Sequence, residues 1–275
     1  MRRCSLLPVV VIALLAMARP VAASIFARAI PSRTSVTVKP DVPVSRDVTI
    51  ANDGDGPVVV HVRLSDWSLD NHGELELLPA GKTNVSLAGL VHFEPEQFSL
   101  AAGQSGVIHV TLRLPADGPA TRWGLLLSEV RPAVWSKSGF GPRAIAQLGT
   151  TLYVSRVPAD RVHGELTAMD VRSQGDSMTV ALKLENSGER HLYAAAKISV
   201  RDSAGTTVAD ADLGTSVVLP GMERVFTWTC GIPLAPGRYA VTATMDTGEP
   251  ELIVGETRVQ WPLNRPRLIA GDGSP

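Results

Sequence analysis

Apolar and polar residues alternate over short stretches along most of the chain, a pattern that predicts β-strands. Apolar residues occupy every second position over residues 58–64, 108–114 and 178–184. A period of two places one row of side chains in a core and the other near water. No long stretch shows the 3.6-residue period of an amphipathic helix. We therefore expect an all-β chain.

Turn-forming residues separate these stretches. The chain has 24 glycines and 20 prolines, and turn signals such as Asn52-Asp53-Gly54, Asn186-Ser187-Gly188 and Pro236-Gly237 recur along it. Many short strands at this spacing are typical of a sandwich or barrel. Both halves repeat one order of elements, in which an Asn-containing turn follows a strand and a later Gly turn leads into an aromatic-led strand. This repeat predicts two tandem immunoglobulin-like β-sandwich domains.

The first 23 residues have the pattern of a cleaved signal peptide. Arg2 and Arg3 precede an apolar run over residues 6–16, and the small residues Val21 and Ala23 suit signal peptidase. The apolar run is shorter than the ~20 residues that cross a bilayer. We expect a mature chain that starts near Ser24, lies in the periplasm or is secreted, and has no membrane span.

The remaining 252 residues contain one cysteine, Cys230, so no internal disulfide can form. Their 23 basic and 27 acidic residues give no reason to expect nucleic acid or an acidic membrane surface as partner. Their length favours two domains. We place these at residues 24–158 and 159–262, with a poorly ordered tail over residues 263–275.

The first half resembles the N-terminal domain of periplasmic pilus-assembly chaperones. The likeness rests on VTIAND over residues 48–53, FEPEQFSL over residues 93–100, a strand that closes at Leu114-Pro115, and an apolar strand over residues 125–130. AIAQLGTTLYVSRVP, over residues 144–158, is similar to the edge strand of that family. The resemblance implies a strand that completes the sheet of an exported client.

The resemblance also implies partner-binding residues. Family chaperones hold the client's terminal carboxylate with an Arg on the first strand and a Lys before the aromatic pair of the last strand. Arg33 is the nearest basic residue to the first position, displaced by a few residues, and Thr151 occupies the second. One row of the edge strand would contact the client: Ala146, Leu148, Thr150 and Leu152. The same alternation also fits an ordinary last strand with one face in its own core.

A second function class is a structural or adhesive module of the cell envelope. Trp135 lies in the long connection over residues 131–143, together with Phe140. Exposed aromatic side chains bring a large contact area at a small entropic cost. Such a loop would bind a surface protein or a glycan.

The sequence offers no pattern of catalytic or metal-binding residues. Its six histidines are scattered singly, and most are expected to face solvent. Cys230 is expected to be a buried, inert thiol on the inner face of the second sandwich, beside Phe226 and Trp228. We expect no enzyme, cofactor or metal. The expected function is an exported, non-catalytic protein-binding protein, chaperone-like or an assembly accessory for envelope or pilus components.

Overall fold

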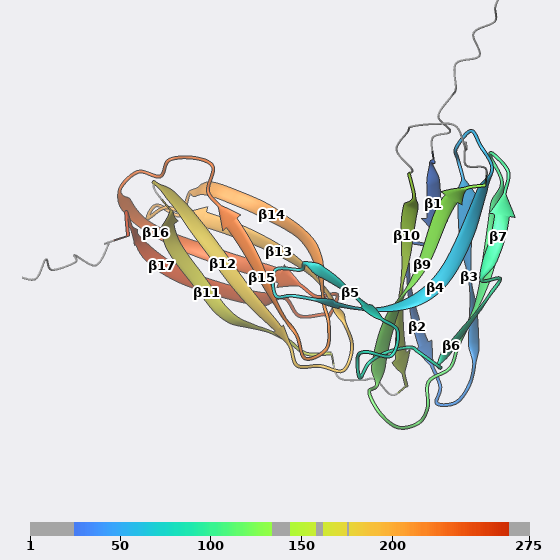
Figure 1. The fold of residues 1–275 in the computed structure, drawn as a ribbon. Helices are drawn as coiled ribbons and strands as arrows, with labels where there is room; N and C mark the ends of the chain where they lie inside the picture. Colours follow the sequence, from blue (N-terminus) through green and yellow to red (C-terminus); the bar gives the residue numbers. More distant parts are fainter. Residues whose placement is uncertain (1–24, 134–143, 158–161, 175, 264–275) are drawn as a thin grey trace, which may run out of the picture.

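The computed structural model describes residues 25–133, 144–157, 162–174 and 176–263. These residues form two β-sandwiches in tandem, which confirms the predicted all-β, immunoglobulin-like architecture (Figure 1). The predicted signal peptide, the break proposed between the domains at residues 158–160 and nearly all of the predicted tail lie outside the described residues.

The first sandwich packs two sheets against each other. One sheet has the strand order β1 (Ala27–Ile30), β3 (Val44–Asn52), β8 (Ser105–Leu112) and β6 (Val91–Glu94). The other has the order β2 (Arg33–Val38), β10 (Ala146–Arg156), β9 (Thr121–Pro132), β4 (Val58–Leu69) and β5 (Leu75–Pro79), with β7 (Gln97–Leu100) also pairing with β4. All of these pairs are antiparallel except β2 with β10, which is parallel.

The second sandwich is wholly antiparallel. Its smaller sheet has the order β11 (Gly164–Gln174), β12 (Ser177–Asn186) and β15 (Glu223–Thr229). Its larger sheet has the order β14 (Thr207–Val218), β13 (Leu192–Arg201), β16 (Gly237–Asp246) and β17 (Ile253–Trp261).

The alternating apolar rows form the two cores. On β8, Ile108 and Val110 are fully buried while His109 between them is exposed, and on β12 the buried row includes Val180 and Leu182. Cys230 is buried in the second core, as expected. Period-two burial therefore determines which face of each strand turns inward.

The internal repeat predicted from the sequence has a structural counterpart in Asn52 and Asn186. Each side chain is fully buried at the end of a strand. The Asn52 amide donates to the carbonyls of Gly56 (2.9 Å) and Ala101 (3.0 Å), and the Asn186 amide donates to those of Arg190 (2.8 Å) and Val218 (2.9 Å). In both, the amide oxygen accepts the backbone N–H two residues later. One turn design thus occurs in both sandwiches.

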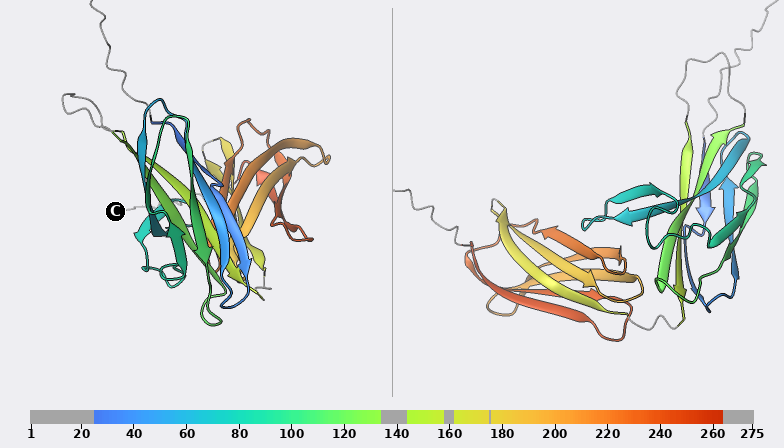
Figure 2. Two further views of the ribbon diagram at one scale, coloured as in Figure 1. Left: turned by 90° about the vertical axis from the view of Figure 1, so that its right-hand side faces the viewer. Right: turned by 60° about the horizontal axis from the view of Figure 1, so that its bottom comes forward.

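The β4–β5 hairpin extends from the first sandwich to the second, as Figure 1 and the right-hand view of Figure 2 show. At its tip, the carbonyl of Asn71 accepts a hydrogen bond of 2.7 Å from the N–H of Val225 on β15. A third apolar cluster joins the two sandwiches behind the hairpin, with Trp67, Trp123 and Tyr153 from the first and Leu219 from the second. The sandwiches therefore share a packed interface.

Candidate functional site

The last strand of the first sandwich, β10, has two halves with different surroundings. Leu152 and Val154 in its second half are fully buried in the core of the first sandwich. Ala146 and Leu148 in its first half are partly buried and pack against the same core. The inward face of β10 therefore belongs to its own sandwich, as the ordinary-strand interpretation expected.

The two edges of β10 are paired over different lengths. One edge pairs with β9 from Ala146 to Ser155. The other pairs with β2 only from Thr151 to Arg156. Over residues 146–149, no strand of the described part of the chain pairs with that second edge. The first half of β10 is therefore an open edge, with backbone N–H and C=O groups available to another strand.

The open edge arises because the N-terminal strand is divided between the two sheets. β1 pairs with β3 in one sheet, and β2 pairs with β10 in the other. Pro31 lies between β1 and β2 and has no N–H to donate to a ladder. The Thr150 hydroxyl donates to the Pro31 carbonyl (3.1 Å), and the Thr151 N–H donates to the Ser32 carbonyl (3.0 Å). Pairing with β10 therefore begins only at Thr151.

The predicted partner-binding row is divided in the same way. Thr150 is 1% exposed and Leu152 is not exposed at all, so both side chains are occupied within their own sandwich. Ala146 and Leu148 are partly accessible beside the open edge, and Ile145, just before β10, is 48% exposed. The accessible apolar side chains of this segment thus lie at residues 145–148.

Arg33 and Thr151 are direct partners across the β2–β10 pair. In the sequence, Arg33 lies a few residues from the place of the chaperone family's arginine. The parallel register of β2 and β10 nevertheless puts it beside Thr151, which occupies the place of the family's lysine. Its guanidinium carbon lies 4.4 Å from the centroid of the Tyr193 ring, which belongs to the second sandwich. A cation over an aromatic face is favourable. Arg33 therefore lies at the junction of the two sandwiches, next to the neutral hydroxyl of Thr151. Trp135, the remaining predicted contact residue, lies outside the described residues.

An aromatic cluster at this junction was not predicted. Tyr153 stacks on His191 with the ring centroids 4.1 Å apart, and both rings make edge contacts with Tyr193. Trp67 makes an edge contact with Tyr153. Trp67 and Trp123 lie in β4 and β9 and are each only 4% exposed. They are buried because the second sandwich covers the outer face of those strands.

The junction also contains a serine–histidine contact. Ser35 Oγ lies 3.4 Å from His191 Nε2. Burial lowers the pKa of His191 to about 4, with further lowering from the nearby charges of Arg190 and Arg33. Burial also raises the pKa of Tyr153, and electrostatic interaction with the Tyr193 phenol group adds to that shift. An imidazole that resists protonation is a poor general base for Ser35 near neutral pH.

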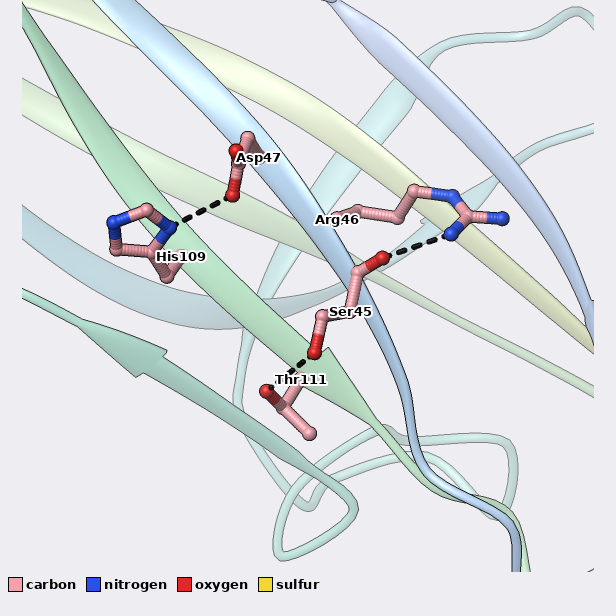
Figure 3. A network of polar contacts seen from close by, with 5 residues as sticks. All are labelled: Ser45, Arg46, Asp47, His109 and Thr111. Carbon is pink, nitrogen blue, oxygen red and sulfur yellow. Dashed lines mark hydrogen bonds and ion pairs between the residues drawn. The ribbon is translucent and has the colours of Figure 1, made fainter.

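Most of the other histidines are exposed, as expected. On the outer face of the β3–β8 pair, His109 Nδ1 lies 2.8 Å from Asp47 Oδ1, and Ser45 hydrogen-bonds Thr111 two residues along (Figure 3). Within residues 25–133, 144–157, 162–174 and 176–263, no group of three His, Cys, Asp or Glu side chains is arranged to hold a metal ion. The same residues contain no helix that is long and apolar enough to cross a bilayer.

No family model and no curated protein matches the sequence. Solved structures are similar over most of the chain, and three complexes of a pilus or fimbrial chaperone are among them. The CsuC–CsuE chaperone–tip adhesion subunit complex from Csu pili of Acinetobacter baumannii has 12% identity and a TM-score of 0.46, over 84% of this chain and 97% of that one. A chaperone–tip adhesin complex of CFA/I fimbriae biogenesis has 10% identity and a TM-score of 0.47, over 84% and 98%.

The third is the SafA pilin in complex with the SafB chaperone of Salmonella enterica, with 13% identity and a TM-score of 0.43, over 85% of this chain and 97% of that one. At these identities and scores the likeness carries no argument about function. The strand order of this chain establishes its fold.

Proposed function

We propose that this chain is an exported, non-catalytic, chaperone-like protein that binds an unpaired strand of another exported protein along the open edge of β10. One observation carries the proposal: β10 is paired on both edges from Thr151 onward, but on only one edge over residues 146–149. The signal-peptide pattern of residues 1–23 supports export to the periplasm or beyond.

The main chain of β10 supplies the binding groups. An unpaired edge presents N–H and C=O groups that an extended segment can satisfy, and main-chain hydrogen bonds then provide affinity largely independent of the client's sequence. The second half of β10 is anchored between β2 and β9, and it holds the first half in an extended conformation. This preorganisation lowers the entropic cost of binding.

The side chains beside the edge set what kind of client strand fits. Ile145 and Leu148 offer apolar surface, whereas Ala146 and Gly149 are small. A client strand would therefore make a few apolar contacts with these side chains, and none of them would reach deep into the client. Arg33 lies beside Thr151, where the open edge ends, and can meet a carboxylate with one charge-assisted contact. We expect the main-chain ladder, more than this single cation, to determine the client's register.

The test is capture of exported proteins by the mature chain and by two matched variants. Ile145→Glu adds a charge next to the open edge, at a side chain that is 48% exposed. Val107→Glu adds the same charge on β8, at a side chain that is 41% exposed and lies away from β10. We expect wild type and Val107→Glu to recover the same exported protein and Ile145→Glu to lose it. Equal recovery by all three folded proteins would refute the proposal.

A further inference from the structure

Three arginines gather on the outer face of the larger sheet of the second sandwich. Arg201 on β13 and Arg258 on β17 are both direct partners of Ala240, one on each side of β16. Arg238 lies two residues before Ala240 on β16, and therefore on the same face. All three arginines are exposed. Their side chains surround Ala240, whose own side chain is only a methyl group.

A hollow of about 710 Å³ lies at this position. Ala240 and Thr242 lie on its floor, and the turn after β13 lines one side with Ser203 and Gly205. The turn is held by Asp202, whose Oδ1 accepts the N–H groups of Ala204 and Thr206, both at 2.9 Å. The hollow therefore combines guanidinium groups with hydroxyl donors on a fixed backbone.

The charges of the arginines are only partly balanced. Arg258 Nη2 lies 3.4 Å from Glu256 Oε1. In the described part of the chain, Arg201 and Arg238 make no ion pair. Asp202 Oδ1 accepts two N–H groups of its own turn, and its carboxylate and that of Glu256 line the hollow as well. Three guanidinium groups against two carboxylates leave a local excess of positive charge. The whole chain has a formal net charge of −1, so this local excess of positive charge is not a general property of its surface.

Acidic residues limit the positive area. In the next row of the same face, Glu256 is the partner of Thr242, and Asp210 is the partner of Ser199. A long polyanion lying across the sheet would meet these carboxylates and be repelled. A compact anion above Ala240 would lie among the three guanidinium groups, which outnumber the two carboxylates, Asp202 and Glu256, that line the same hollow. The charge pattern therefore favours a single, highly charged group over an acidic peptide or a nucleic acid.

We propose that this hollow, the Arg201–Arg238–Arg258 site, binds a phosphate group carried by a small molecule or by a lipid headgroup. The planar guanidinium fork matches the oxygens of phosphate and forms paired, charge-assisted hydrogen bonds. Ser203 and Thr242 supply neutral hydroxyls on the same hollow. The site lies in the second sandwich and is independent of the open edge of β10 in the first.

The experiment is isothermal titration of the mature chain with inorganic phosphate and with glycerol 3-phosphate, and flotation with phosphatidylcholine vesicles with and without phosphatidic acid. We expect binding that weakens as NaCl is raised. Arg201→Gln and Arg238→Gln should each weaken it about tenfold, because each removes charged hydrogen bonds. Arg201→Lys should fall between wild type and Arg201→Gln, because it keeps the charge and loses the fork.

Arg172→Gln is the matched control, since Arg172 is an exposed arginine on β11, in the other sheet of the same sandwich. It should bind as wild type does. Binding of soluble phosphates alone identifies a small-molecule ligand, and binding of phosphatidic acid vesicles alone identifies a headgroup; either result supports the site. Binding of neither the soluble phosphates nor the phosphatidic acid vesicles would overturn it, as would binding that is unchanged in folded Arg201→Gln and Arg238→Gln; either result would leave the strand-binding proposal untouched.

Discussion

Tyr153 of the first sandwich stacks on His191 of the second, with the ring centroids 4.1 Å apart and the planes 18° apart. Tyr153 is on β10, three residues after Thr150, where the open part of that strand has ended. The strand that we propose to bind a client is thus also a strand that holds the two sandwiches together. Packing at the junction fixes the second half of β10 and leaves the first half available.

The His191 stack predicts a dependence of stability on pH. The folded protein lowers the pKa of His191 from 6.5 to about 4, so the unfolded chain binds more protons between these values. Stability is therefore fully present above about pH 6.5 and falls as the pH is lowered toward 4. Between pH 7 and 4, the melting temperature of wild type should fall more steeply than that of His191→Gln, which cannot gain this proton. If the melting temperatures of the two proteins fall equally with pH, protonation of His191 is not the cause of the loss of stability.

The hairpin tip makes a second contact between the sandwiches that can be tested at Gly73. Gly73 has φ +85°, and a Cβ added there would overlap the guanidinium group of Arg224 on β15. Gly248 has φ +80° and nothing within 4 Å of an added Cβ. Both Ala variants carry the backbone cost of a left-handed conformation, about 1 kcal/mol. Only Gly73→Ala also displaces Arg224.

Small-angle scattering and urea unfolding distinguish these two glycine variants. Gly73→Ala should be the less stable, because the Arg224 side chain must move from the hairpin tip, and the loss of that contact should widen the range of distances between the sandwiches. Gly248→Ala should keep the wild-type scattering profile. Identical profiles and stabilities for both variants would show that the hairpin contact does not hold the junction.

The two buried asparagines predict equivalent losses in the two sandwiches. Asn52→Ala leaves three backbone carbonyls, and Asn186→Ala two, without their amide partner, and each also leaves one turn N–H without its acceptor. Each should cost about 1–3 kcal/mol of unfolding free energy, measured in urea. Asn71→Ala is the control, because Asn71 is exposed and uses its backbone carbonyl for its contact with Val225. If Asn71→Ala lost as much unfolding free energy, the amide hydrogen bonds of Asn52 and Asn186 would not be what stabilises the two turns.

The sequence was sufficient for the fold because the fold follows from local pattern. Rows such as Val180 and Leu182 repeat at period two, and the turn asparagines Asn52 and Asn186 occur at matching points of the two halves. Both signals depend on neighbours in the chain. They therefore predicted strands, turns and two tandem sandwiches without knowledge of which strands pair.

The candidate site was predicted less completely, because it depends on pairing between distant segments. Sequence spacing displaced Arg33 from its expected place, while the parallel β2–β10 register puts it beside Thr151. The sequence assigned one binding row to the whole strand, but Leu152 is buried in its own sandwich and Leu148 lies beside the open edge. His191 contributes to the junction only because the second sandwich folds back onto β10, which no local pattern reveals.

Backbone hydrogen exchange along β10 tests the central claim most directly. The amides of Gln147 and Gly149 point to the same edge of β10 as that of Thr151. In the free protein, they should exchange faster than those of Tyr153 and Ser155, since β2 covers that edge only from Thr151 onward. With a captured client bound, the Gln147 and Gly149 amides should become protected while the exposed strands of the second sandwich are unchanged. Slow exchange of these two amides in the free protein, or client binding that leaves their exchange unaltered, would contradict the account.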